Sequence, residues 1–294
     1  GEVRALMELH AEDRLPLRVR LQLPYTMLPY AESMGLRTGF GDEWLHLGAV
    51  KLFADGSLGA RTAALLAPYC DDESTTGDLL LDSEELLDRL RHIHGAGFQA
   101  CIHAIGDRAL AAVLDAVEQE AATAPPDCRP PAPPRIEHAS LVNPELISRM
   151  RRLGVGAAVQ PQFAWSDRWL PERVGAVRLP GCYAFRALDE AGIPLAGSTD
   201  CPVERLDALA AIGAALHRPA WAPGEALSLA AALKIFSEGS YAVAGRPRRP
   251  GRLQPGGFAD FVVLDEDPRL VPPAEVHRIP VAMTVVGGEL RYGG

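Results

Sequence analysis

The stretch RIEHASLVNPELISRMRRLGVGAAVQ, residues 135–160, contains a short apolar run, a helical pattern and a second apolar run in succession. The two apolar runs predict strands over residues 135–139 and 155–160, and the segment between them predicts a helix over residues 144–153. A strand, a helix and a second strand in this order indicate a parallel β/α unit. This stretch therefore predicts an α/β fold.

The same alternation continues on both sides of this unit. Further strands are expected at residues 17–23, 47–54, 98–104 and 193–198, and further helices at residues 83–94, 107–122, 185–191, 206–216 and 225–242. Asp82 or Ser83 as an N-cap and Gly95 as the terminating residue support the first of these helices. Residues 1–243 are therefore expected to form one domain, either a β/α barrel or a doubly wound sheet.

The last fifty residues have a different texture. Residues 251–265 (GRLQPGGFADFVVLD) place Gly and Pro turns between short apolar strands. Residues 281–292 predict a closing pair of strands, with Gly287–Gly288 as the two-residue turn between them. We assign residues 244–294 to a separate C-terminal β segment.

Composition excludes several classes of protein. Of the 294 residues 48% are hydrophobic and 23% charged, which supports a large core and argues against disorder. The net charge of −9 argues against a nucleic-acid partner, and no apolar run reaches the ~20 residues that a membrane span needs. Five scattered cysteines fit neither a disulfide framework nor a zinc knuckle, so a reducing, cytoplasmic setting is expected.

Four polar residues occupy the carboxyl-terminal halves of predicted strands: Lys51, His103, His138 and Asp200. Parallel β/α folds place their active sites at this edge, so the four side chains are expected to converge. Two neutral imidazoles and a carboxylate are typical ligands of Zn²⁺ or a similar ion, and Asp200 could accept a proton from a metal-bound water. Lys51 could either attack a carbonyl or take up CO₂ as a metal-bridging carbamate, and spacing does not choose between these.

Each residue also has a purely structural interpretation. A lone buried histidine more often makes a core hydrogen bond than binds a metal, and Asp200 fits an Asx turn. Asp107 fits the N-cap of the following helix, and Asp55 and Arg61 fit a role in ordering the adjacent turn. Polar residues at the ends of four strands have no explanation in core packing, and this combination favours an active site.

The pair His92 and His94 has the H-x-H spacing that chelates a metal on a strand. Here the pair falls in the last turn of a predicted helix, where residues two apart point in different directions. We expect these histidines to interact with the helix terminus and not with a metal.

Taken in order, the motifs resemble the amidohydrolase superfamily, specifically its family 3 branch. The resemblance rests on VKLFADGSLGARTAAL, HAIGDRA, RIEHA, LGVGAAVQPQF and GSTDCPVERLDAL, and on the tail GRLQPGGFADFVVLDEDP. It implies a (β/α)8 TIM barrel with a metal site at its mouth, together with a β-sandwich. It also implies hydrolysis of a C–N bond in a small amide- or formamide-type molecule by a metal-activated water.

The resemblance also implies roles for individual residues. Lys51 would be a carboxylated bridging ligand, His103 and His138 would hold one metal, and Asp200 would be both a ligand and the general base. Three further residues would neighbour the site as candidate substrate-binding groups: Arg61, Asp107 and Gln160. The expected cofactor is zinc, as one or two ions.

One feature of the family is missing from this sequence. Family members carry an H-x-H pair on the first barrel strand, and no such strand precedes Lys51. The expectation is an incomplete barrel that lacks its first strands, with an impaired metal site and open sheet edges that favour a homo-oligomer. Two alternatives stay open: a non-catalytic barrel fragment that binds a ligand or partner, and a Schiff-base lyase that uses Lys51.

Overall fold

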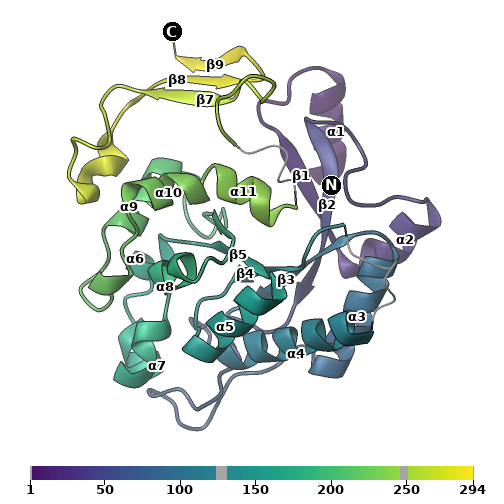
Figure 1. The fold of residues 1–294 in the computed structure, drawn as a ribbon, viewed down its shortest axis with the longest axis vertical. Helices are drawn as coiled ribbons and strands as arrows, with labels where there is room; N and C mark the ends of the chain where they lie inside the picture. The colour runs from purple at the N-terminus through teal and green to yellow at the C-terminus, as the bar shows by residue number, and fades with distance from the viewer. Residues whose placement is uncertain (1, 124–130, 246–250, 294) are drawn as a thin grey trace.

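The computed structural model describes residues 2–123, 131–245 and 251–293 (Figure 1). Its centre is a curled sheet of six parallel strands in the order β1-β2-β3-β4-β5-β6. The strands are β1 (Val19–Pro24), β2 (Leu45–Phe53), β3 (Gln99–Ala104), β4 (Arg135–His138), β5 (Gly156–Val159) and β6 (Leu195–Gly197). Each strand pairs with the next one in the sequence, so the chain crosses over between every neighbouring pair.

Helices follow most strands, and Figure 1 shows α3, α4 and α5 together on one side of the sheet. Asp82 and Glu85 form a capping box at the start of α3, and Gly154 ends α5 at a φ of 68°. The helices are α1 (Glu2–Ala11), α2 (Leu28–Ser33), α3 (Ser83–Gly95), α4 (Asp107–Thr123), α5 (Pro144–Leu153), α6 (Phe163–Ser166), α7 (Leu170–Arg178), α8 (Phe185–Glu190), α9 (Ala208–Leu216), α10 (Leu229–Ile235) and α11 (Glu238–Val243). No helix within the described ranges is long and apolar enough to cross a membrane.

The predicted strands and most predicted helices are confirmed, with two differences. The helix expected over residues 225–242 is two helices, α10 and α11, which are separated at Phe236 and Ser237. Helices α1, α2, α6 and α7 were not predicted from the sequence. Helix α1 buries none of its residues, and α6 is a single short turn, so neither carries a strong apolar periodicity.

The two faces of the sheet differ in chemistry because side chains alternate along a strand. Val50, Leu52 and Ile102 belong to the hydrophobic core. Lys51 and Cys101 lie between these positions and are paired in register on neighbouring strands, so they point to the opposite face. The face turned away from the helices is therefore unusually polar for the centre of a sheet.

The eight strands implied by the family resemblance are not present in the described residues. The parallel sheet has six strands, and its ends, β1 and β6, do not pair with each other in this part of the chain. Residues 2–11 form helix α1, and no strand lies between this helix and β1. The observed sheet is thus a half-barrel, consistent with a barrel that lacks some of its strands.

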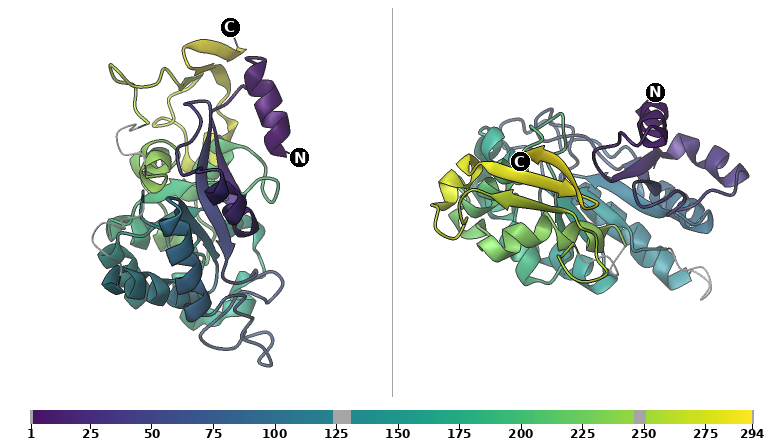
Figure 2. Two further views of the ribbon diagram at one scale, coloured as in Figure 1. Left: turned by 90° about the vertical axis from the view of Figure 1, so that its right-hand side faces the viewer. Right: turned by 90° about the horizontal axis from the view of Figure 1, so that it is seen from above.

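A second, smaller sheet contains three antiparallel strands: β7 (Phe261–Leu264), β8 (Val281–Val286) and β9 (Glu289–Gly293). Gly287 and Gly288 join β8 to β9 with φ values of 64° and 83°, as a two-residue hairpin turn of type I′ requires. Arg18 connects the two sheets through an ion pair of 2.7 Å to Asp260. Figures 1 and 2 place this sheet at one end of the molecule, while α7 lies at the other end in Figure 1. A domain boundary between residues 243 and 244 stays a prediction.

Candidate metal centre

Two histidines meet at the carboxyl ends of neighbouring strands. His103 lies in β3 and His138 is the last residue of β4, and their ring centroids are 4.5 Å apart with an interplanar angle of 71°. Lys51 lies on β2 next to them, and Asp200 follows β6. The positive charge of Lys51 acts to lower the pKa of both histidines and of the Asp200 carboxyl.

Gln160 determines which nitrogen of His138 is free. His138 Nδ1 lies 2.8 Å from Gln160 Oε1, and Gln160 Nε2 donates to the Ala158 carbonyl at 2.9 Å. Because the amide nitrogen is already directed at a carbonyl, the amide oxygen must face the ring and accept the Nδ1 proton. His138 Nε2 therefore keeps its lone pair for a ligand.

His103 is held by the opposite ring nitrogen. Its Nε2 lies 2.8 Å from the carbonyl oxygen of Gly56, which can only accept, so Nε2 carries the proton and Nδ1 has the free lone pair. Burial is the main cause that lowers the pKa of both histidines to about 4. The neighbouring His138 also acts to lower the pKa of His103, and the positive charge of Lys51 acts to lower that of His138. Both rings are neutral at pH 7, which is the form that binds a metal.

Asp200 is an exposed residue close to the positive charge of Lys51. Partial desolvation raises the pKa of its carboxyl above the usual range, although Lys51 and His103 act in the opposite direction. Its φ is +53°, and those of His138 and Ala139 are +81° and +47°. Residues other than glycine adopt such angles at a cost, and they cluster at functional sites. Three of the six that the described residues contain lie at this centre.

Glu137, on the face of the sheet that is turned away from the helices, was not expected to belong to the site from the sequence. Glu137 accepts from Arg135 Nε at 2.8 Å and from the Cys101 thiol at 2.8 Å. Burial alone would raise the pKa of Glu137, but the charges of Arg135 and Lys51 outweigh it and hold the pKa below its usual range. Glu137 is therefore an ionised counter-charge close to Lys51. The signal in the sequence is the pair of charges at 135 and 137, two residues apart in a predicted buried strand.

Asp55 forms hydrogen bonds with the two loops next to His103, the loop after β2 and the turn after β3. Its fully buried carboxylate accepts from the backbone N–H groups of Ala64, Ile105 and Gly106 at 2.8–3.0 Å. One of its oxygens lies 3.5 Å from His103 Nε2. Asp55 thus connects the loop after β2 to the turn after β3, which is a wider role than the ordering of one adjacent turn.

Arg61 and Asp107 already have partners within the protein. Arg61 forms a two-point ion pair with Asp71 at 2.7 and 3.2 Å. Asp107, at the start of α4, accepts from the backbone N–H groups of Leu66 and Arg108 at 2.9 and 3.0 Å. Both interactions hold the loop after β2 in place. A substrate contact from either residue stays a prediction.

The histidines of the H-x-H pair on α3 have separate partners. His92 lies 3.0 Å from the Tyr25 hydroxyl and 3.1 Å from Glu32, while His94 lies 2.6 Å from Glu120. The two rings therefore do not share a ligand position. They stabilise contacts between α3 and the elements beside it.

The two imidazoles suit a divalent metal, but the described residues do not supply a complete set of ligands for one. His103 and His138 offer neutral imidazoles whose free nitrogens are fixed by Gly56 and Gln160. In the described part of the chain, however, no three His, Cys, Asp or Glu side chains lie close enough together to hold a metal ion. Lys51 or residues outside these ranges would have to complete such a site.

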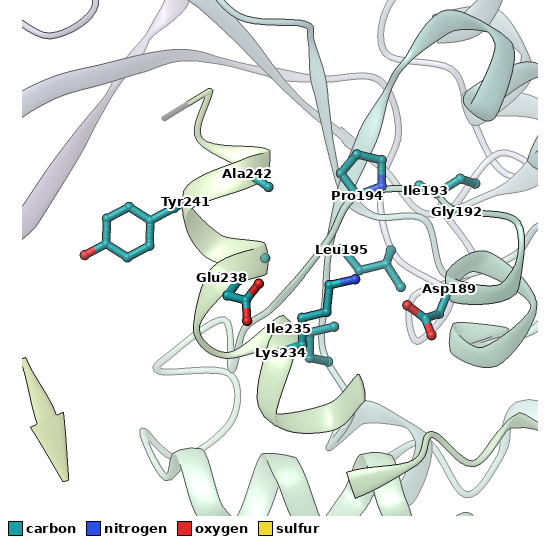
Figure 3. A pocket seen from close by; sticks show the side chains of 11 residues that line it. Asp189, Gly192, Ile193, Pro194, Leu195, Lys234, Ile235, Glu238, Tyr241 and Ala242 are labelled. Atoms are coloured by element: carbon teal, nitrogen blue, oxygen red, sulfur yellow. The ribbon is translucent and has the colours of Figure 1, made fainter. Parts of the chain in front are cut away.

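A pocket elsewhere in the half-barrel does not belong to this centre. It has a volume of about 340 Å³ and lies between α8, β6, α10 and α11, with Asp189, Lys234 and Glu238 among its charged residues (Figure 3). Its walls include Pro194 and Leu195, at the amino end of β6. The candidate metal centre lies at the carboxyl ends of the strands, which is the opposite edge of the sheet.

Comparison with known proteins gives the family. A model described as the amidohydrolase family matches residues 1–292. The chain belongs to this family. YtcJ of Bacillus subtilis (strain 168), whose name places it among the amidohydrolases, is 33% identical over 299 residues, covering 99% of this chain and 55% of YtcJ.

Two further proteins are similar to this amidohydrolase. An uncharacterized metal-dependent hydrolase from Pyrococcus furiosus is 36% identical, with a TM-score of 0.82 over 90% of this chain and 54% of that structure. An N-substituted formamide deformylase from Arthrobacter pascens is 26% identical over 84% of this chain and 46% of its own length. The chain spans about half the length of the curated relatives it matches.

Replacing Gln160 by leucine should weaken metal binding. The leucine side chain has a similar size but cannot accept the Nδ1 proton of His138, so the ring loses its fixed orientation. Loss of such a partner typically costs about 10–100-fold in metal affinity. Equilibrium dialysis against zinc would measure this effect, with the exposed Gln119→Leu as a matched control. Equal zinc affinity in the Gln160 variant and the wild type would contradict the assigned tautomer.

The buried histidines should make the metal-free protein less stable in mild acid. Their pKa is near 6.5 in an unfolded chain and about 4 in the folded one, so between these values the unfolded state binds more protons. Their contribution to the free energy of unfolding is therefore complete above pH 6.5 and decreases as the pH falls to 4. Urea unfolding at several pH values should show a loss of roughly 3 kcal/mol per histidine relative to a His103→Gln/His138→Gln variant. Parallel pH profiles for the two proteins would show that the histidines titrate normally.

Proposed function

We propose that this amidohydrolase carries the catalytic centre of a metal-dependent enzyme that hydrolyses a C–N bond in a small amide- or formamide-type molecule. The observation that carries the proposal is the pair formed by His103 and His138. Two neutral imidazoles lie 4.5 Å apart at the carboxyl edge of a parallel sheet, each with one nitrogen free. The formamide deformylase among the relatives supports the bond type.

His103 and His138 would hold the metal, and Lys51 would join them as a ligand if its amine takes up CO₂. A bound divalent metal such as zinc supplies a water whose pKa is lowered to about 7. Asp200 would accept the proton of the attacking water at its carboxylate and pass it to the departing nitrogen. Its raised pKa suits this task, because a stronger base takes a proton more readily.

Glu137 sets the charge around Lys51 in this scheme. As a buried anion paired with Arg135, it lies near the Lys51 amine without a direct ion pair of 4 Å or less in the described residues. Glu137 would oppose a second negative charge at Lys51. Uptake of CO₂ by Lys51 would therefore depend on a bound metal to balance the charge.

A panel of N-substituted formamides and amides tests the proposal. The chain is loaded with zinc in bicarbonate buffer, and release of the amine is measured with and without a chelator. Turnover that the chelator abolishes and zinc restores supports a metal-dependent hydrolase. Turnover that survives the chelator, together with borohydride trapping of substrate on Lys51, would instead indicate a Schiff-base lyase. A folded protein that binds zinc but turns over none of the panel would refute the proposed bond type.

A further inference from the structure

A second pocket lies beside the loops that carry Gln160 and Asp200. We call it the Trp165 pocket; it has a volume of about 430 Å³. Its walls come from the segment after β5, from the segment after β6 with α9, and from the 3₁₀ helix η4 (Pro273–Arg278). The lining residues used here are Gln162, Trp165, Glu204, His217 and His277.

Trp165 provides a fixed aromatic surface in this pocket. Its indole stacks on His217 with ring centroids 5.1 Å apart and an interplanar angle of 25°. The indole Nε1 donates to the His217 carbonyl at 2.8 Å, so the ring is held at two points. Trp165 is nevertheless 40% exposed. An indole face that is held in place and open to a pocket is suited to a cation or an aromatic group.

Two acceptors on the same pocket lack a donor. Gln162 Oε1 is buried and has no hydrogen-bond partner among the described residues. Glu204 is half-buried, and within the described ranges it makes no ion pair or hydrogen bond through its carboxylate. Neither lysine nor arginine lines the pocket. A buried acceptor without a donor costs free energy, so the pocket is prepared for a ligand that donates.

We propose that the Trp165 pocket binds the ammonium group of a primary amine whose apolar body lies on the Trp165 indole. An ammonium has three donors and a positive charge, which matches Gln162 Oε1 and the Glu204 carboxylate together. An anion would be repelled by Glu204. A metal ion is disfavoured, because no three ligating side chains cluster in the described part of the chain.

Amine binding here does not require the metal centre or hydrolysis. If the proposed function is also correct, amine binding in the Trp165 pocket complements hydrolysis at the metal centre, because cleavage of an amide C–N bond releases an amine. The strands that lead into the pocket, β5 and β6, are the same ones that precede Gln160 and Asp200.

Calorimetric titration with phenethylammonium tests the pocket. The chain is kept in a chelator, so that binding at the metal centre makes no contribution. We expect phenethylammonium to bind and 2-phenylethanol, its neutral analogue, to bind at least about tenfold more weakly. Glu204→Gln and Trp165→Leu should each weaken amine binding at least about tenfold. The exposed Glu145→Gln, at the start of α5, should leave it unchanged.

Several outcomes would overturn the inference. Equal binding of the amine and the alcohol would remove the role of the charge, and unchanged binding in Glu204→Gln would place the amine elsewhere. Circular dichroism of each variant separates loss of the pocket from loss of the fold. If hydrolysis depends on metal but no amine binds, this inference fails alone; if the amine binds but no substrate is hydrolysed, the proposed function fails alone.

Discussion

Substitution of Asp200 by asparagine should lower kcat by about 10²–10⁴-fold while most of the bound metal is retained. Asparagine keeps an oxygen at nearly the same place but cannot accept the proton of the attacking water. This expectation rests on the proposed role of Asp200 as the base, which its raised pKa would suit. The measurement is the steady-state rate on the best substrate of the formamide and amide panel, with zinc content determined on the same sample.

A matched control is available for this substitution. Asp189 lines the pocket at the opposite edge of the sheet, so Asp189→Asn should leave kcat unchanged. A fall in metal content that parallels the fall in kcat would assign Asp200 only to metal binding. Full turnover in Asp200→Asn would show that another group serves as the base.

Substitution of Asp55 by alanine should destabilise the protein by about 3 kcal/mol or more at pH 5, because three buried N–H groups lose their acceptor at about 1–3 kcal/mol each. Burial raises the pKa of Asp55 to about 6 against the opposing effect of those N–H groups. A raised pKa means that the wild type gains stability as the pH falls from above 6 toward 4, where Asp55 takes up its proton. The alanine variant lacks this gain, so the difference between the two proteins should be larger at pH 5 than at pH 8.

Urea unfolding at the two pH values measures this effect, and the histidine contributions cancel in the comparison. Asp55→Asn should lie between the wild type and alanine, since one oxygen can still accept from two of the three N–H groups while the amide faces the third. Wild-type stability in the alanine variant at pH 5 would contradict the role of Asp55 as the acceptor that joins the loops.

The positions of the strands, and of the polar residues near their carboxyl ends, could be predicted because both depend on the local sequence. A buried parallel strand is a short apolar run, and a charged or imidazole side chain in its last residues stands out, as Lys51 and His138 do. The break between α10 and α11 could not be predicted in this way. No proline marks it, and the helical pattern continues through Phe236 and Ser237.

The groups that support the site depend on contacts between distant segments. Asp55 bonds to the backbone of residues 105 and 106, about fifty positions away, and nothing in the sequence around Asp55 indicates this. Gln160 was expected near the site, but its hydrogen bond to His138 needs the register of β4 against β5. Closure of the sheet into an eight-stranded barrel likewise depends on pairing between distant strands, and the sequence around the six parallel strands does not indicate it.

Zinc stoichiometry of the purified chain tests the central claim most directly. After equilibrium dialysis against zinc with bicarbonate, and removal of loosely bound ions, elemental analysis gives equivalents of zinc per chain. A metal centre built from Lys51, His103, His138 and Asp200, as we propose, predicts at least one equivalent in the wild type and its loss in a folded His103→Ala/His138→Ala variant. No bound zinc in the folded wild type, or equal zinc in the double variant, would contradict a metal centre at this edge of the sheet.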